Sequence, residues 1–326
     1  MNRFFIGVRK INKYIVDGHC DTVLNMRDSS YNFLKLNPSF HLDLPRLKKS
    51  DIGIQVFALY IEEKFKPHFA VQRTIQLIDK FYEMLKSSKK LQIIRDYEDI
   101  EDISESNKIG ALLAIEGADG VFDLSALRNF YRLGVRLITL TWNYRNHIAD
   151  GVSESETGGG LTKYGRKMVK EMNRMGMIVD ISHISACGFW DTLKICQNNI
   201  VASHSNSKSV CDVARNLTDK QIEAIAKKNG VIGINFCPYF LNKSDEADIK
   251  DIIKHINYIK RLVGIDYIGI GSDFDGIKKT PVDLNDITEL KDLKQQLKKN
   301  GFSEQEIDKI MYKNWLRVFK EVLGGP

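Results

Sequence analysis

Short apolar runs alternate with segments of helical periodicity along nearly the whole chain. Eight of these runs are rich in β-branched residues and are predicted to be strands. They cover residues 13–18, 53–60, 110–115, 135–141, 177–182, 199–203, 230–236 and 266–271. Several are apolar almost from end to end, which is typical of parallel strands that are covered on both faces.

Helical patterns fill the gaps between the predicted strands. In residues 68–87, for example, Leu77, Ile78 and Phe81 fall on one apolar stripe. Eight consecutive β/α units predict a single (β/α)₈ TIM-type barrel over residues 1–326, with a doubly wound parallel sheet as the alternative. The other expected helices cover residues 162–175, 185–197, 218–228 and 249–263, and the last begins at the capping box Ser303–Glu306 and ends at Gly324-Gly325.

Composition narrows the class of protein. The chain has 326 residues, of which 43% are hydrophobic, so it can bury a large core. Its five cysteines are dispersed and odd in number, which argues against a disulfide framework. No signal peptide or membrane-spanning run is apparent, so we expect a soluble cytoplasmic protein that does not bind membranes. The formal charge of +6 comes from dispersed lysines, which predicts a solvated surface and no nucleic-acid partner.

Candidate chemistry begins in the first predicted strand, at His19-Cys20-Asp21. Side chains two positions apart on a strand share a face, so His19 and Asp21 point to one spot as a nitrogen and an oxygen ligand. Such triplets also arise by chance, and a lone histidine at a strand end is more often a hydrogen-bonded core residue. The case for a metal site therefore depends on further ligands.

Further ligand-type residues lie at the ends of later predicted strands. They are Glu116, His183 and His204, with Asp273 following the last strand. In a β/α barrel the carboxyl ends of all strands converge on one face, so these side chains would meet in one pocket. Taken singly, Glu116 could be a helix N-cap, and Asp273 and Asp275 could be turn formers before Gly276.

Nitrogen and carboxylate ligands favour a divalent transition metal, and we predict zinc, although cobalt and manganese also suit such ligands. Three histidines and two carboxylates exceed the needs of one catalytic zinc, so two ions are predicted. Glu116 could bridge them, with His19 and Asp21 completing one site and His183 and His204 the other. A water or hydroxide shared by the two ions would be the nucleophile.

These residues resemble those of the membrane (renal) dipeptidase family, zinc peptidases of the amidohydrolase superfamily. The resemblance runs through nearly the whole chain, and it implies a (β/α)₈ barrel with the same five ligands around two zinc ions. Family members are often dimers, so a homodimer is compatible with it. The segments that carry it are Asp17–Asp21, Ala114–Gly117, Gly159–Thr162, Met175–His183, Ala202–Ser205, Ala214–Asn216, Gly271–Gly276 and Asn314–Phe319.

The resemblance also implies roles in substrate binding and catalysis. Arg215 matches the arginine that holds the substrate carboxylate, and Asp273 matches the acid/base residue, whereas the sequence alone does not separate Asp273 from Asp275. One position departs from the family pattern. Mammalian-type members carry a substrate-contacting histidine after the fourth strand, where this chain has Trp142, and His147 five residues later is a candidate substitute.

The leading hypothesis is a zinc-dependent dipeptidase acting on small dipeptides, including L-D dipeptides. A related binuclear amidohydrolase acting on N-acyl amino acids or lactams is the enzymatic alternative. His-x-Asp rather than His-x-His in the first strand makes that alternative weaker. The non-enzymatic alternative is a barrel whose metals are only structural.

Overall fold

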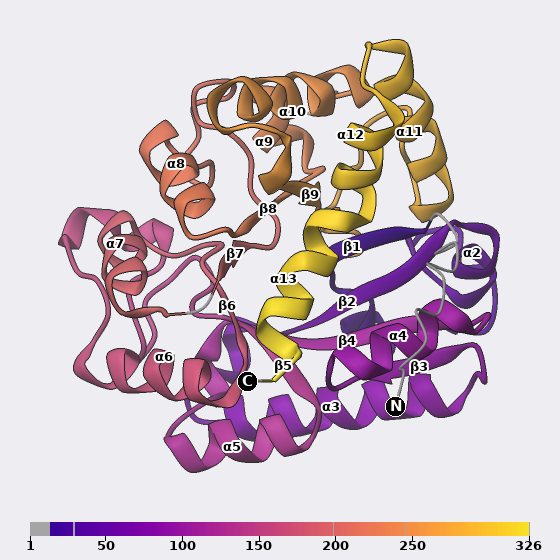
Figure 1. Ribbon diagram of the computed structural model, residues 1–326. Coiled ribbons are helices and arrows are strands. Elements are labelled where there is room, and N and C mark those ends of the chain that lie inside the picture. Colours follow the sequence, from indigo (N-terminus) through magenta and orange to yellow (C-terminus); the bar gives the residue numbers. More distant parts are fainter. Residues whose placement is uncertain (1–13, 29, 198, 245, 326) are drawn as a thin grey trace, which may run out of the picture.

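A computed structural model describes residues 14–28, 30–197, 199–244 and 246–325. The eight predicted strands are all present, and they close into one parallel ring in the order β1-β2-β4-β5-β6-β7-β8-β9, with β1 paired to both β2 and β9 (Figure 1). The first residue of the predicted strand 13–18 and the N-terminal segment, in which no signal peptide is expected, lie outside the described residues. The ring strands are β1 Ile15–Cys20, β2 Ile52–Tyr60, β4 Ile109–Glu116, β5 Val135–Thr139, β6 Ile178–Asp180, β7 Ile200–Ala202, β8 Val231–Ile234 and β9 Ile268–Ile270.

One strand, β3, was not predicted. It spans Leu91–Ile94 and pairs in parallel with the first half of β4, whose second half pairs with β5. The eight-residue β4 is long enough to accommodate both neighbours, so β3 lies outside the closed ring. The (β/α)₈ prediction is confirmed, and the doubly wound sheet is wrong because such a sheet leaves two edges open.

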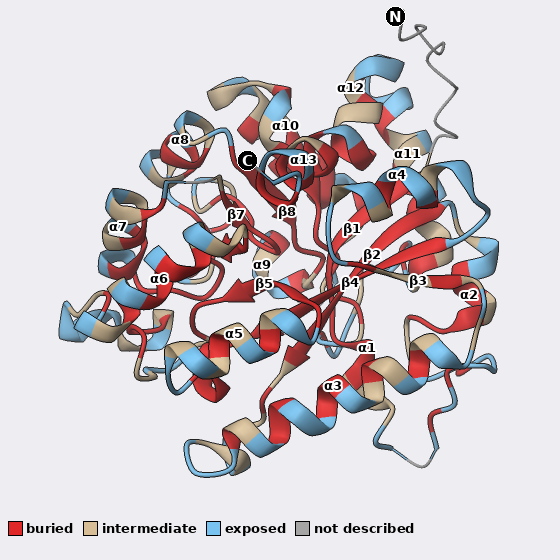
Figure 2. Cartoon of the chain, turned by 60° about the horizontal axis from the view of Figure 1, so that its bottom comes forward, coloured by how far each residue is buried: buried red, intermediate tan, exposed pale blue. Residues whose placement is uncertain are grey.

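Helices surround the ring and turn one face towards it (Figure 2). In α3, Leu77, Ile78 and Phe81 are buried as their spacing predicts. No helix in the described part of the chain is long and apolar enough to cross a membrane. The helices are α1 Thr22–Asn25, α2 Leu44–Lys49, α3 Ala70–Lys86, α4 Tyr97–Glu105, α5 Leu124–Arg132, α6 Lys163–Met175, α7 Ala186–Ile195, α8 Asp219–Lys227, α9 Pro238–Asn242, α10 Ile249–Val263, α11 Leu290–Lys299, α12 Glu304–Asp308 and α13 Asn314–Leu323.

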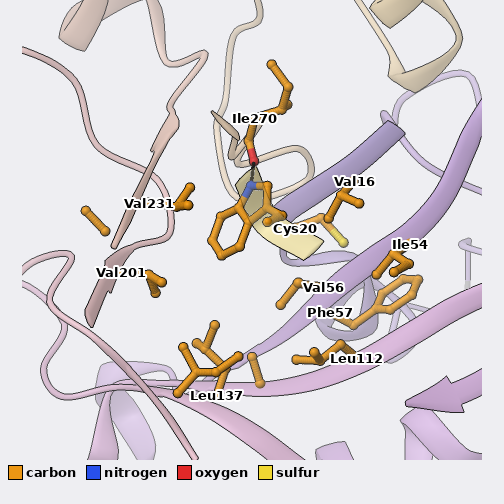
Figure 3. Close-up of a cluster of buried hydrophobic side chains, with 14 of the residues drawn as sticks. Val16, Cys20, Ile54, Val56, Phe57, Leu112, Leu137, Val201, Val231 and Ile270 are labelled. Carbon is orange, nitrogen blue, oxygen red and sulfur yellow. Dashed lines mark hydrogen bonds between the residues drawn. The ribbon is translucent and has the colours of Figure 1, made fainter. Parts of the chain in front are cut away.

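Apolar strand residues fill the barrel interior. Figure 3 shows Val56, Leu137, Val201 and Val231 facing this interior from four different strands, and all four are fully buried. In a barrel of this kind, side chains from alternate strands fill the interior in layers, so the interior is a packed core rather than a channel. The polar residues needed for chemistry are therefore confined to the ends of the strands.

The last helix contributes a buried tryptophan to the seam between the first and last strands. One π-helical turn, Lys309–Lys313, precedes α13 and directs Trp315 towards that seam, where its indole N–H donates to the carbonyl of Ile270 at 2.9 Å. Gly18 and Gly269 make room for the ring, since a Cβ on Gly18 would lie 2.2 Å from it.

A polar clamp also joins these two strands. The carboxylate of Asp17, fully buried in β1, accepts hydrogen bonds from the backbone N–H of Ser272 at 2.8 Å and from its hydroxyl at 2.6 Å. Gln55 on β2 donates to the same carboxylate at 2.9 Å. The clamp fixes the loop after β9, which carries Asp273, against the strand that carries His19.

Candidate metal centre and substrate cleft

The structure brings all five predicted metal ligands together at the carboxyl ends of four strands. His19 lies near the end of β1, Asp21 directly follows it, and Glu116 is the last residue of β4. His183 and His204 lie in the loops that begin after β6 and β7. Their ligand atoms form two triads, each with all members within 4.8 Å, and Glu116 belongs to both: His19, Asp21 and Glu116; Glu116, His183 and His204.

Glu116 is oriented as a bridge would be. Its Oε2 faces His19 Nε2 at 3.7 Å, while its Oε1 faces His183 Nε2 at 2.9 Å and His204 Nε2 at 3.4 Å. His19 Nε2 also lies 3.6 Å from Asp21 Oδ2. One carboxylate oxygen therefore serves each triad, as two neighbouring cations require.

Backbone conformation at the site is unusual. His183 and Asp273 have left-handed φ values of 66° and 63°, which are uncommon for residues other than glycine. Such strain persists where the surrounding structure imposes it, and it clusters at functional sites. Here both strained residues belong to the clusters of candidate ligands.

The buried ligands perturb one another's ionisation. Burial alone would lower the pKa of His19, but the Glu116 and Asp21 carboxylates raise it well above its ordinary value. Burial and the charge of Glu116 raise the pKa of Asp21 to about 8. Burial lowers the pKa of both His183 and His204, so these rings are neutral, the form that binds metals.

Two orphaned polar atoms test whether the site fits a cation. His19 Nε2 and Asp21 Oδ1 are buried and have no hydrogen-bond partner among the described residues. A buried polar atom without a partner costs about 1–3 kcal/mol, so native proteins rarely leave one unpaired. Both atoms lie in the cluster and are of the types that bind zinc, so the residues present fit divalent metal ions.

Asp273 is close to the metal ligands, whereas the Asp275 carboxylate is held by hydrogen bonds to other segments of the chain. Asp273 forms a third triad with His19 and His204, and its Oδ2 accepts from Asn235 Nδ2 at 2.9 Å. The Asp275 carboxylate instead accepts from the Thr22 hydroxyl at 2.6 Å and the His41 backbone N–H at 2.7 Å. The geometry thus favours Asp273 as the residue that can act on a substrate.

Two hollows meet at His183. A cleft of about 590 Å³ is lined by Asp21, Glu116, Asp273 and the aromatic rings of Tyr60, Trp142, Tyr239 and Phe240. A smaller one of about 390 Å³ contains Arg215. Because His183 lines both hollows, the one that contains Arg215 adjoins the one that contains the metal ligands.

Arg215 is anchored with part of its guanidinium free. Its Nη2 donates to the His204 carbonyl at 3.1 Å and its Nη1 lies 3.4 Å from the Ser205 hydroxyl. Its Nε is buried without a hydrogen-bond partner in the described chain. Burial lowers the pKa of Arg215 from its ordinary value, but a guanidinium stays charged. A carboxylate is the ligand that best satisfies it.

Trp142 lines the larger cleft, as expected for its position after β5. Its ring centroid lies 5.0 Å from that of Tyr60 and 6.0 Å from that of His183. His147 does not replace the missing histidine. Its Nε2 lies 2.8 Å from the Val121 carbonyl, and its ring stacks on Phe122 and Tyr164, away from the residues that line the cleft.

Residues behind the ligands were missed by sequence reasoning. Asn143 Oδ1 lies 2.7 Å from His183 Nδ1, and Ser203 and Asp180 lie behind the other rings. A signal was present, because Asp180 is a charged residue inside the otherwise apolar run 177–181. A buried carboxylate in such a run must have hydrogen-bond partners, which marks it as part of a polar network.

The sequence is similar to that of a known peptidase family. Residues 9–323 match the family described as Membrane dipeptidase (Peptidase family M19). Dipeptidase 3 of Mus musculus is 30% identical over 325 residues, a match that covers 94% of this chain and 64% of the mouse protein's length.

Solved structures are also similar. The crystal structure of "dipeptidase AC", a metallopeptidase, is 28% identical and has a TM-score of 0.91, covering 96% of this chain and 99% of that one. A metallopeptidase from Rhodobacter sphaeroides, solved with a phosphinate mimic of the dipeptide L-Ala-D-Ala, is 27% identical with a TM-score of 0.89, covering 95% and 99%.

Proposed function

The chain belongs to the membrane dipeptidase family (peptidase family M19). We propose the following roles for its own residues in hydrolysing a dipeptide. It is a metallo-dipeptidase. The observation that carries the proposal is the orientation of Glu116, which offers one oxygen to His19 and the other to His183 and His204. We assign two zinc ions to these ligands, with Asp21 completing the His19 site.

Ions at this site would supply an activated water at neutral pH and polarise the scissile carbonyl. Glu116, His183 and His204 are in the metal-binding state before an ion arrives, whereas His19 and Asp21, whose pKa values are raised, would release protons when it binds. Neutral His183 and His204 offer nitrogen lone pairs, and Glu116 stays ionised: burial opposes this, but His19 and its contacts with His183 and His204 keep the pKa of Glu116 well below its ordinary value.

Asp273 is proposed as the general base and then the general acid. It accepts the proton of the attacking water and delivers it to the leaving amine. Asn235 fixes its orientation by donating to Oδ2, which leaves Oδ1 for the proton transfer. The same carboxylate lies within 4.8 Å of the ligand atoms of His19 and His204, close to where the substrate would be held.

Arg215 is proposed to bind the C-terminal carboxylate of the substrate. With the scissile bond at the metal centre and the substrate carboxylate at Arg215, one residue would lie beyond the scissile bond, as in a dipeptide. Trp142, with Tyr60 beside it, forms an apolar wall for the first residue.

The R. sphaeroides relative binds a mimic of L-Ala-D-Ala, and we therefore propose L-D as well as L-L dipeptides as substrates of this chain. We also propose a cytoplasmic location, because the five cysteines are dispersed along the chain and odd in number, which fits a reducing compartment. The homodimer stays a prediction.

The test is hydrolysis by zinc-loaded protein of a panel of L-L dipeptides, L-D dipeptides and N-acyl amino acids. We expect dipeptides to be cleaved and Asp273→Asn to lower kcat by about 10²–10⁴-fold. Asp275→Asn is the matched control, because the same substitution two residues away removes a structural carboxylate and should leave kcat near that of the wild type. Turnover of N-acyl amino acids alone would refute the assignment.

A further inference from the structure

A single hydroxyl lies behind two of the candidate ligands. Ser203 Oγ is 2.7 Å from Nδ1 of His204 and 3.3 Å from Nδ1 of His19. We assign these two histidines to different metal sites, since His19 groups with Asp21 and Glu116 and His204 groups with Glu116 and His183, although both also lie in the triad that contains Asp273. Ser203 is fully buried, so its contacts are made with the protein.

Asp180 determines which way this hydroxyl points. The Asp180 carboxylate is fully buried and accepts from the Ser203 hydroxyl at 2.6 Å and the Thr139 hydroxyl at 2.6 Å. It also accepts from the backbone N–H groups of Ser182 at 3.0 Å and Ser203 at 2.9 Å. An ionised carboxylate only accepts, so the one hydrogen of the Ser203 hydroxyl is given to Asp180.

The Ser203 oxygen can still accept two hydrogen bonds, one from each of the two imidazole rings. A serine oxygen has two lone pairs besides its hydrogen, and two imidazole nitrogens face it. Each ring must then present an N–H at Nδ1, which leaves the Nε2 lone pair of each directed towards Glu116 and the other ligands. The Ser182 hydroxyl is farther from Ser203, at 3.5 Å.

We propose that Ser203, oriented by Asp180, is a shared positioning residue that sets the tautomer and ring orientation of one histidine in each metal site. This rests on the ligand assignment of the proposed function. Other interactions fix each ring only in part: the two imidazoles lie against each other with centroids 3.8 Å apart. Loss of the one hydroxyl therefore affects both ions at once.

His183 provides the internal comparison. Its Nδ1 lies 2.7 Å from Asn143 Oδ1, separate from Ser203. Asn143 thus supports one ligand of one site, whereas Ser203 supports a ligand of each. Removing the outer partner of a metal-binding histidine typically lowers metal affinity by about 10–100-fold.

The experiment compares Ser203→Ala, Ser203→Thr and Asn143→Ala by competition between protein and a chelator for zinc at fixed pH. We expect Ser203→Ala to weaken both zinc equivalents by about 10–100-fold and Asn143→Ala to weaken one. Ser203→Thr keeps a hydroxyl and should restore affinity at both sites. A Ser203→Ala protein in which only one equivalent, or neither, is weakened would overturn the proposal.

A second measurement uses the wild-type protein and does not depend on the folding of any variant. In zinc-loaded protein labelled with ¹⁵N-histidine, His19 and His204 should each show a proton on Nδ1, and a proton on Nε2 of either ring would contradict the proposal. Dipeptide hydrolysis is assayed in parallel. If the wild-type protein binds two zinc ions but hydrolyses no dipeptide, the proposed activity is refuted. The role of Ser203 in zinc binding can still be measured in that case.

Discussion

Gly276 follows the Asp273-Phe274-Asp275 segment, and its lack of a side chain allows the loop after β9 to approach the metal centre. A Cβ at this position would lie 2.1 Å from Asp21 Oδ2 and 2.6 Å from Asp273 Oδ1. Real Cβ atoms essentially never approach within 3.0 Å, so the Asp21 carboxylate would have to retreat by about 0.9 Å. Gly276→Ala therefore changes the position of two site carboxylates without removing either.

The expected cost follows from that displacement. A misplacement of about 1 Å in a catalytic arrangement can lower the rate about 10²-fold, which corresponds to about 2.7 kcal/mol of transition-state stabilisation. The φ of Gly276 is not in the left-handed region, so alanine is compatible with the backbone. Alanine should also reduce the freedom of the unfolded chain, which is worth about 0.4–1 kcal/mol in favour of folding.

The assay measures kcat/KM for a dipeptide, zinc affinity by chelator competition, and the free energy of unfolding of the metal-free protein. We expect a loss of about 10² in kcat/KM, a weaker affinity at the site that contains Asp21, and nearly unchanged stability. Wild-type kcat/KM with both zinc ions bound would refute the reasoning. A large loss of stability would instead show that the loop itself cannot accept a methyl group.

Three further predictions concern binding and stability. Arg215→Lys should raise KM for dipeptides by at least about 10-fold with a smaller change in kcat, because an ammonium cannot form the two parallel bonds to a carboxylate; equal KM would contradict the proposed anchor. Burial lowers the pKa of His255 to about 4, whereas in the unfolded chain it is about 6.5. The neutral buried ring therefore contributes fully to the free energy of unfolding above about pH 6.5. This contribution is lost as pH falls towards 4, and the loss is about 2 kcal/mol at pH 5. Urea unfolding should show this loss in the wild type and not in His255→Gln. Gly18→Ala should lower the free energy of unfolding by about 1–3 kcal/mol, because the new methyl group overpacks against Trp315. In a double-mutant cycle, Gly18→Ala should be nearly neutral when Trp315→Leu is already present.

The sequence was sufficient to predict the ring and its five candidate ligands for a physical reason. Parallel strands buried on both faces leave long apolar runs, and residues at the carboxyl ends of these runs must lie at the same end of the barrel. His19, Glu116, His183 and His204 all lie at or just beyond such an end. The unpredicted β3 has only four residues and pairs with one strand alone, so it leaves no comparable pattern.

The residues behind the ligands depend on distances between strands, which a one-dimensional pattern does not contain. Ser203 contacts His19 across 184 positions of sequence, and only the closed ring brings them together. His255 is a second example, because it is fully buried and accepts from the Ser207 N–H at 3.1 Å, 48 positions earlier in the chain. Its place beside Ile252 and Ile256 on the buried face of α10 is the sequence signal for its burial, but the pattern does not name its partner.

The clamp between Asp17 and Ser272 has a consequence for biosynthesis. Its partners are separated by 255 positions, so a nascent chain carries β1 long before its neighbour β9 leaves the ribosome. Until then β1 and β8 both present unpaired edges, which are templates for aggregation. High contact order of this kind slows folding. The N-terminal strand that supplies His19 is thus completed only by the last strand to be translated, and a chain interrupted before residue 268 cannot shield that edge.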